Sequence, residues 1–389
     1  MTINTNSTNR KKILIVSISN YDSLTNVNMN KYLLLKENYF GDLLGVTCNK
    51  EYVDKDIDGF KMKVTFLSKK WMSVKLVKYI IFFFNSLYQC LFSHYREGNY
   101  DIIIAREPQL AGPMAFIISK LTRTKLIVEL NGNYANPCIW EDISNAWLRK
   151  LKKGLSSRII PFVLTKAHGI KLLYPAQADF YLDKDTLSNK VVSTFHEYTP
   201  ISLFKPVDDE QKILLSMGFP YRVKGFDIAI QSFLKIAHKI PDFELHLVGF
   251  LWPNERDLLK NMIGGNKQIK LLKPLEYPSA MKKVSECSIF LLASRTEAMG
   301  RVLLEAMAHK KPLIGSSVDG IPTYIRDGFN GLVFKSECVD DLAAKILLLS
   351  EDYNMREMFA TNGLQYVTEE LSEESYLKKY HCLIQEVLT

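Results

Sequence analysis

Short apolar runs alternate with longer mixed segments along the first half of the chain, and this alternation limits the possible folds more than any other feature. The runs at residues 12–18, 101–105 and 125–130 are short and rich in β-branched residues, whereas residues 107–121 form a longer segment of helical character. Apolar runs of this length are typical of strands buried on both faces. Strands that alternate with helices predict an α/β fold, with a parallel sheet covered on both sides.

The alternation restarts after a polar, proline-containing stretch at residues 204–211, which is typical of a linker. Strand-like and helix-like segments then follow in turn, at residues 213–218, 225–240, 243–250, 269–272, 278–287, 288–294 and 311–317. A chain of 389 residues also exceeds what one hydrophobic core usually supports. We therefore predict two Rossmann-like, doubly wound domains, residues 1–205 and 206–372, that face across a cleft. A last helix at residues 373–389 is expected to return to the first domain.

The cysteines and the N-terminus both indicate a cytoplasmic protein. The six cysteines lie far apart with no paired spacing, which favours reduced thiols and argues against a zinc cluster. The first residues, MTINTNSTNRKK, are polar and lead directly into a strand-like run. We therefore expect no secretory signal.

Positive charge is concentrated in two segments of the first half. Residues 61–96 and 143–178 each contain seven lysines or arginines and no acidic residue, while acidic residues outnumber basic ones elsewhere. Such segments indicate an anionic partner: phospholipid, nucleic acid or a phosphorylated substrate. Residues 71–96 fit either a buried core helix or an interfacial helix on anionic lipid. Their longest apolar run, residues 79–84, is far shorter than the ~20 residues of a membrane-spanning helix.

Two glutamates, Glu297 and Glu305, flank the expected start of a helix that follows the strand-like run ending at Ser294. An isolated pair of this kind is typical of a helix cap and a solvated helical acid. After a strand, however, the unpaired backbone N–H groups of the first helical turn form an anion site. We expect these groups to be those of Ala298, Met299, Gly300 and Arg301. Gly300 lets a phosphate approach without meeting a Cβ atom, while Glu297 and Glu305 suit the diols of a hexose and a ribose.

Further landmarks follow in a fixed order between Ser294 and Phe334. They are Ser294, Glu297, Gly300, Glu305–Ala308, Pro312, Gly320–Pro322 and Asp327–Gly331. This order resembles the donor-binding region of the retaining glycosyltransferases of family 4, which have the GT-B fold, and the resemblance covers about residues 212–370. It implies a nucleotide-sugar donor that is bound by the second domain.

A second landmark of that family is a Gly-Arg pair followed five residues on by Lys-Gly. Gly218, Lys224 and Gly225 match it, whereas Phe219 takes the position of the arginine. The resemblance implies that Lys224 neutralises the leaving diphosphate, and Arg222 is a candidate for the missing cation. The candidate catalytic residues are therefore Lys224, Arg222 and Glu297, and the candidate donor-binding residues are Gly218, Gly225, Ala298, Met299, Gly300, Arg301 and Glu305.

Four polar residues of the first domain follow strand-like runs and are candidates for contact with an acceptor hydroxyl: Arg106, Glu107, Glu129 and Asn131. The alternative is a structural role, because polar residues at strand ends often only cap. Asp-x-Asp sequences at residues 54–58 and 183–185 lie in charged loop sequence and not at a strand end. We therefore assign no metal site and no cofactor.

These features predict a cytoplasmic, retaining glycosyltransferase that moves a sugar from a nucleotide sugar to a hydroxyl of a glycan acceptor without a metal. The basic first domain favours a lipid-linked acceptor at the inner face of the membrane, in the synthesis of a surface polysaccharide such as O-antigen or capsule, and a nucleic acid partner is not expected. Two alternatives stay open. One is a sugar-nucleotide 2-epimerase of the same architecture, and the other is a non-catalytic protein that binds nucleotide sugars.

Overall fold

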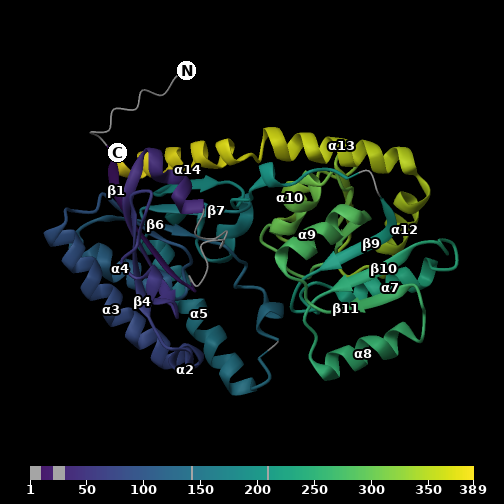
Figure 1. Ribbon diagram of the computed structural model, residues 1–389, viewed down its shortest axis with the longest axis horizontal. Helices are drawn as coiled ribbons and strands as arrows, with labels where there is room; N and C mark the ends of the chain where they lie inside the picture. The colour runs from purple at the N-terminus through teal and green to yellow at the C-terminus, as the bar shows by residue number, and fades with distance from the viewer. Residues whose placement is uncertain (1–9, 21–30, 142, 208–209) are drawn as a thin grey trace. The chain divides into compact units, whose positions relative to one another are not determined.

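The computed structural model describes residues 10–20, 31–141, 143–207 and 210–389, and the chain divides into two compact units (Figure 1). Unit 1 comprises the residues up to Asn131, Lys150–Tyr198 and Tyr376–Thr389, and unit 2 comprises Gly132–Arg149 and Thr199–Ser375. The segment Gly132–Arg149 thus belongs to unit 2, although the chain on both sides of it belongs to unit 1. The alternation of strands and helices in the sequence carries no sign of this exchange.

Unit 1 is built on an eight-stranded sheet, sheet A, in the order β3-β4-β2-β1-β5-β6-β7-β8. All neighbouring strands are parallel except β3 and β4. Its central strands are buried runs of isoleucine, leucine and valine, which need helices on both faces of the sheet. The strands are β1 (Lys11–Asn20), β2 (Tyr39–Thr47), β3 (Asp56–Ile57), β4 (Phe60–Phe66), β5 (Ile102–Ala105), β6 (Lys125–Glu129), β7 (Gly169–Leu172) and β8 (Val191–Thr194).

Helices cover both faces of sheet A. On one face α3 packs on β2 and β4, and α4 packs beside it on β1, β5 and β6. On the other face α14, yellow in Figure 1, buries Tyr376, Tyr380 and Ile384 in a core with Ile13 and Ile104 of the strands. The helices of this part of the chain are α2 (Lys69–Ser73), α3 (Lys75–Arg96), α4 (Ala111–Thr122), α5 (Ala146–Lys166), α6 (Lys184–Ser188) and α14 (Glu373–Leu388).

Unit 2 is built on a six-stranded sheet, sheet B, in the order β11-β10-β9-β12-β13-β14. Every pair of neighbouring strands in it is parallel. The strands are β9 (Gln211–Met217), β10 (Glu244–Val248), β11 (Ile269–Leu272), β12 (Cys287–Leu292), β13 (Leu313–Ser316) and β14 (Gly331–Phe334). The order reverses between β9 and β12, which makes the carboxyl ends of these two strands the expected place for a ligand.

The helices of unit 2 also form a layer on each face of the sheet. α7, α8 and α12 share one core, in which Phe226, Phe233 and Ile346 pack on Leu214 and Ile289 of the strands. α10 packs between α9 and α13 and contacts β12 and β13. The helices are α7 (Phe226–Ile236), α8 (Pro253–Ile263), α9 (Tyr277–Glu286), α10 (Arg301–Ala308), α11 (Ile321–Tyr324), α12 (Val339–Glu351) and α13 (Tyr353–Glu369).

Two α/β units with doubly wound, parallel sheets confirm the predicted fold class. The strands and helices expected in the second half all occur, with ends that differ by a few residues. Within the described part of the chain, no helix is long and apolar enough to cross a membrane.

Candidate functional site

Two adjacent strands of sheet B bring a lysine and a glutamate together. β9 and β12 pair in parallel, so the loops after them leave the same edge of the sheet. Lys224 lies in the loop after β9, Glu297 lies in the loop after β12, and the lysine Nζ donates a hydrogen bond to Glu297 Oε2. Each side chain is 16% exposed, so a ligand can reach the pair while little water surrounds it.

Two glycines of the loop after β9 fix the position of Lys224. A Cβ atom on Gly218 would lie 2.6 Å from Cε of Lys224, so the lysine side chain runs over a bare backbone. Gly225 has a φ of +66° and lies so close to the end of β12 that a Cβ atom would come within 1.9 Å of the Ala293 carbonyl oxygen. A larger residue at either position would push Lys224 away from Glu297.

The helix after Glu297 begins between Glu297 and Glu305, next to Gly300, as the sequence predicted, but two of the residues expected in its first turn precede it. Gly300 is the N-cap of α10, with a φ of +75°, and Arg301 is the first helical residue. The prediction that Ala298 and Met299 lie in the first turn is wrong, because the left-handed backbone of Gly300 ends the loop that contains them. The N-terminal N–H groups and the positive end of the helix dipole therefore lie at Gly300 and Arg301.

Glu305 lies one turn into α10 and is buried. Its Oε1 accepts hydrogen bonds from the Tyr277 hydroxyl at 2.9 Å and from Nε of Arg301 at 3.2 Å. Burial raises the pKa of Glu305, and the charge of Arg301 and the hydrogen bond from Tyr277 oppose this shift only in part. Both hydrogen bonds that the described residues make to this carboxylate end on Oε1, which leaves Oε2 as the acceptor for a ligand.

Asp319 is a site residue that the sequence analysis missed. Its Oδ2 accepts hydrogen bonds from the Thr296 hydroxyl and, at 3.0 Å, from the backbone N–H of Glu297. Its Oδ1 accepts a hydrogen bond from Asn133 Nδ2 at 2.8 Å. Asp319 therefore ties the Glu297 loop to the segment Gly132–Arg149 of the same unit. The only signal in the sequence is an aspartate directly before the turn Gly320–Pro322, which by itself is typical of many turns.

Arg222, the candidate for the missing cation, forms an ion pair with Glu141 in the structure. Nε of Arg222 lies 3.3 Å from Oε2 of Glu141, and about half of each side chain is exposed. Phe219, at the position of the family arginine, is exposed and packs its ring edge-on against Phe250. A further cation near the candidate site is the guanidinium of Arg301, beside Glu305.

Glu129, predicted as an acceptor contact, lies in the core of unit 1. It is completely buried at the end of β6 and accepts hydrogen bonds from Lys31 Nζ at 2.8 Å and from the hydroxyls of Tyr32 and Tyr380 at 3.1 and 2.6 Å. Burial alone would raise the pKa of Glu129, but the ammonium groups of Lys31 and Lys171 outweigh it and lower the pKa. Both carboxylate oxygens are bonded inside the core, so the structure does not support a direct contact with an acceptor.

The other three acceptor-side candidates lie at the ends of β5 and β6. Glu107 caps α4, since its two oxygens accept hydrogen bonds from the backbone N–H groups of Gln109, Leu110 and Ala111 at 2.7, 2.8 and 2.5 Å. Asn131 Nδ2 donates to the Arg106 carbonyl oxygen at 2.6 Å and so joins the two strand ends. Glu107 thus has the capping role that the sequence left open.

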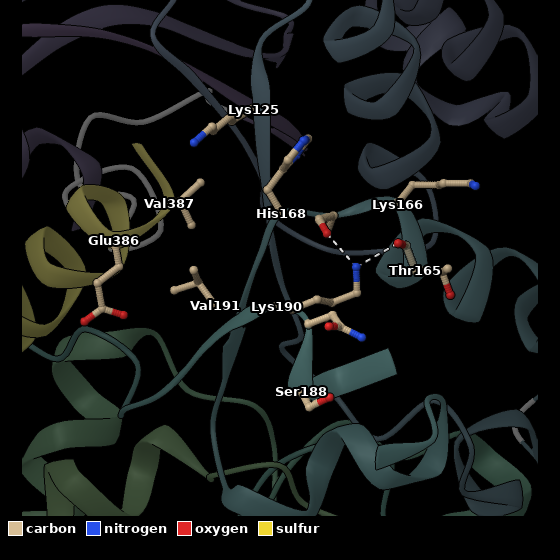
Figure 2. A pocket seen from close by; sticks show the side chains of 11 residues that line it. Lys125, Thr165, Lys166, His168, Ser188, Lys190, Val191, Glu386 and Val387 are labelled. Carbon is tan, nitrogen blue, oxygen red and sulfur yellow. Dashed lines mark hydrogen bonds between the residues drawn. The ribbon is translucent and has the colours of Figure 1, made fainter. Parts of the chain in front are cut away.

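A separate pocket of about 660 Å³ lies in unit 1, at the N-terminal ends of β6, β7 and β8 (Figure 2). Lys125, Lys166, Lys190 and His168 line it, together with Glu386. Lys190 Nζ donates to the carbonyl oxygens of Thr165 and Ala167 at 2.7 Å each, shown by dashed lines in Figure 2. These carbonyls end α5, so the cation serves to cap that helix. The pocket also lies at the end of the sheet opposite to the one where open α/β sheets bind ligands.

Comparison with known proteins links the site to a family. Residues 201–366 match the model of the family glycosyl transferases group 1. An uncharacterized glycosyltransferase of Methanocaldococcus jannaschii is 20% identical over 320 residues, which is 78% of this chain and 80% of the relative. A D-inositol 3-phosphate glycosyltransferase of Kribbella flavida is 21% identical over 72% of this chain and 67% of the relative.

Solved structures share the fold along nearly the whole chain. Sucrose-phosphate synthase from Thermosynechococcus elongatus superposes with a TM-score of 0.72 at 15% identity, over 97% of this chain and 99% of that protein. Anabaena HepE in complex with UDP-glucose superposes with a TM-score of 0.67 at 17% identity, over 97% and 99% of the two chains. The family match covers Lys224, Glu297 and Glu305, so the three residues lie in the part of the chain that resembles glycosyl transferases.

Proposed function

We propose that the chain is a retaining glycosyltransferase that transfers a sugar from a nucleotide-sugar donor to a hydroxyl of a glycan acceptor. The observation that carries this proposal is the ion pair of Lys224 and Glu297 beside the N-terminus of α10. It lies at the strand-order reversal of sheet B, inside the segment that matches glycosyl transferases group 1. HepE was solved with UDP-glucose, which makes this compound the first donor to test.

The proposed chemistry depends on charge that develops as the donor breaks. Cleavage of the bond between the sugar and its phosphate leaves a diphosphate, whose growing negative charge must be stabilised in the transition state. The Lys224 ammonium and the N–H groups at Gly300 and Arg301 supply positive potential on this edge of the sheet. In a retaining reaction the acceptor attacks from the face that the phosphate leaves, and the phosphate oxygen takes the acceptor proton.

The two carboxylates hold the ends of the donor in this proposal. Oε2 of Glu305 accepts hydrogen bonds from the ribose hydroxyls, while Glu297 accepts hydrogen bonds from the hydroxyls of the transferred sugar. Asp319 fixes the backbone of Glu297 and so sets the position of its carboxylate. Because Lys224 and the helix N-terminus carry the positive charge, we expect the reaction to continue in excess EDTA. Loss of turnover in EDTA and its return with Mg²⁺ or Mn²⁺ would disprove metal independence.

We also propose that unit 1 contacts an anionic membrane surface, where it meets a lipid-linked acceptor of surface polysaccharide synthesis. α3 has one buried face, which includes Phe82 and Cys90, and a second apolar face that is exposed. The exposed side chains recur every three or four residues, as a stripe along one side of a helix must: Ile81, Phe84, Tyr88, Phe92 and Tyr95. Such a stripe beside the lysines of α2 is typical of a helix that lies in a membrane interface.

Vesicle binding tests the membrane proposal. Each lysine near an anionic surface contributes about 1 kcal/mol, so Lys69→Gln with Lys70→Gln should weaken binding to phosphatidylglycerol vesicles by about fivefold for each lysine. The double substitution Lys212→Gln with Lys239→Gln, in unit 2, is the matched control and should bind like the wild type. Binding that is equal at low and high salt, or equal on phosphatidylcholine, would contradict the electrostatic contribution.

A donor screen tests the enzymatic proposal. Nucleotide sugars are first ranked by the increase in melting temperature that they cause, because a ligand of the folded state stabilises it. The best donor is then incubated with and without glycan acceptors, and the products are separated by mass spectrometry and NMR. A glycosylated acceptor with the donor's anomeric configuration is the expected result. An epimerised donor without acceptor would establish the 2-epimerase instead, and stabilisation without any product would establish a binding protein.

A further inference from the structure

A second pocket of unit 2 lies beside the loop that carries Lys224. Its volume is about 740 Å³, and three segments of the unit line it. Tyr221 and Arg222 come from the loop after β9, Trp252, Asn254 and Glu255 come from the start of α8, and Glu141, Ser144 and Arg149 come from the segment that joins unit 2. This volume is within the range of pockets that bind small molecules.

A row of exposed aromatic rings ends at Trp252, which lines the pocket. The rings of Phe219 and Phe250 lie 5.6 Å apart, and those of Phe250 and Trp252 lie 4.8 Å apart, each pair in edge-to-face contact. The three side chains are 46%, 41% and 54% exposed in this order. Edge-to-face contacts leave ring faces uncovered, and a contiguous exposed apolar patch usually marks a binding surface.

The polar groups of the pocket carry both signs of charge. Glu141 and Arg222 form a half-exposed ion pair at 3.3 Å, and Glu255 Oε2 accepts the backbone N–H of Trp252 at 2.8 Å. Arg149 and Asn254 add further donors, and Asn254 and Ser144 add acceptors. Two carboxylates balance two guanidinium groups, so the pocket does not select an anion. Paired donors and acceptors around an aromatic face match a neutral molecule with many hydroxyls and an apolar C–H face.

We propose that this pocket, with Trp252 as its platform, is a saccharide subsite that binds a stretch of the glycan acceptor. The electron-rich face of the indole attracts the C–H face of a pyranose ring, and Glu141, Arg149 and Asn254 bond its hydroxyls. Phe219 lies next to Gly218, so the aromatic row continues from this subsite to the loop of Lys224. The assignment of the saccharide as acceptor rests on the proposed function, whereas the saccharide site itself does not.

The experiment compares saccharide binding by the full chain and by Trp252→Ala. Wild type and variant are applied to an array of defined oligosaccharides, and the glycans that bind are titrated by calorimetry. Removal of a central aromatic anchor should weaken the binding of these glycans at least about tenfold. Tyr353→Ala, which removes an exposed aromatic ring elsewhere on unit 2, is the matched control and should leave the affinity unchanged. Donor-induced melting shifts are measured on the same samples to show that Trp252→Ala is folded.

Three outcomes would overturn the subsite: no glycan of the array binds the wild type, Trp252→Ala binds as tightly as the wild type, or only phosphorylated and sulfated glycans bind and inorganic phosphate displaces them. The last result would make the pocket an anion site. Failure of the subsite is separable from failure of the proposed function. If the wild type transfers sugar and Trp252→Ala does not change glycan binding, only the subsite is disproved. If the wild type binds glycans but consumes no nucleotide sugar, only the enzymatic function is disproved.

Discussion

Each unit contains a lysine paired with a glutamate near the carboxyl end of a parallel strand, and the two pairs differ in their surroundings. In unit 1, Lys31 Nζ contacts Oε2 of Glu129 at 2.8 Å, and both side chains are buried. In unit 2, Lys224 contacts Glu297, and both side chains are partly exposed. The first pair is enclosed by tyrosine hydroxyls and by further charges, whereas the second has a loop on one side and a helix N-terminus on the other.

The difference separates a pair that holds the fold from a pair that can bind a ligand. Glu129 has hydrogen-bond donors on both oxygens, and Lys31 also contacts Oε1 of Glu197 at 2.7 Å. Such a buried cluster offers a substrate almost no exposed surface, and removing one member leaves buried charge behind. Lys224 can bind a phosphate in addition to Glu297, because its ammonium has two more protons to donate and is partly exposed to solvent. Burial therefore distinguishes two pairs of identical composition, and we propose a ligand only for the partly exposed pair.

The largest effect is expected for the buried pair. Glu129→Ala leaves Lys31 with Glu197 alone and removes the acceptor of the Tyr32 and Tyr380 hydroxyls, so the free energy of unfolding should fall by about 3–5 kcal/mol. Urea denaturation measures this change. Substitution of the surface partner of Lys212, Asp242→Ala, is the control and should change the free energy of unfolding by less than about 1 kcal/mol. An unchanged urea midpoint for Glu129→Ala would show that the cluster does not hold unit 1 together.

The pH dependence of the same pair follows from the lowered pKa of Glu129. The ordinary pKa of a glutamate side chain is 4.5, and the ammonium groups around Glu129 lower its pKa in the folded state. A lowered carboxyl pKa stabilises the fold above the ordinary value, and this contribution is lost as the pH falls below it. The difference in stability between the wild type and Glu129→Gln should therefore shrink when the pH is lowered from 7 to 4. A difference that grows on acidification would contradict the assigned direction.

The next largest effect is expected for the partly exposed pair of Lys224 and Glu297, and it should change the reaction kinetics and not the free energy of unfolding. In the proposed reaction Lys224 faces the leaving diphosphate, whose negative charge grows toward the transition state. Lys224→Ala should therefore lower kcat by about a hundred- to a thousandfold, while KM for the donor changes less. Lys235→Ala breaks an exposed pair with Asp340 in the same unit and should keep the wild-type kcat. A near-normal kcat for Lys224→Ala would refute its role at the leaving group.

The sequence predicted the fold of unit 2 better than that of unit 1 because the two sheets differ in composition. The strands of sheet B are short apolar runs, such as residues 287–292, that stand out between helices. In sheet A, β4 alternates lysines with apolar residues, and β2 contains glycines and the buried Asp42, whose partners are the Tyr100 hydroxyl and Ser93. A strand whose polar side chains find partners far along the chain has no local signal.

The candidate site shows the same limit at the level of residues. Lys224 and Glu297 lie in motifs with fixed spacing, so the sequence could bring them together. Asp319 accepts a hydrogen bond from the backbone N–H of Glu297, and the Tyr277 hydroxyl donates to Glu305 from another helix. Both contacts depend on how the segments pack and leave no motif in the sequence. The prediction that Glu129 contacts an acceptor is not supported by the structure, for the opposite reason. A charged residue at a strand end is typical of a site, and only the structure shows that Lys31, Tyr32 and Tyr380 of α14 enclose it.

A smaller effect is expected at the inner glutamate of unit 2. Glu305→Ala should weaken donor binding by roughly ten- to a hundredfold, because charge-assisted hydrogen bonds to the ribose of about 1.5–3 kcal/mol are lost. Calorimetric titration with the donor measures the loss. Glu357→Ala, which removes an exposed carboxylate that pairs with Lys310, is the control and should bind the donor normally. Unchanged donor affinity in a folded Glu305→Ala protein would exclude the ribose role.

The smallest effect tests whether Tyr277 works through Glu305. The Tyr277 hydroxyl holds Oε1, so Tyr277→Phe should leave the carboxylate less well oriented and weaken donor binding by about two- to tenfold, the equivalent of one hydrogen bond. If the tyrosine acts only by positioning Glu305, the double variant Tyr277→Phe with Glu305→Ala should bind the donor as Glu305→Ala alone does. Additive losses in this double-mutant cycle would instead mean that Tyr277 contacts the donor directly. The donor site of unit 2 would then extend beyond Glu297 and Glu305 to the start of α9. The buried pair of Lys31 and Glu129 in unit 1 has no such extension among its described contacts.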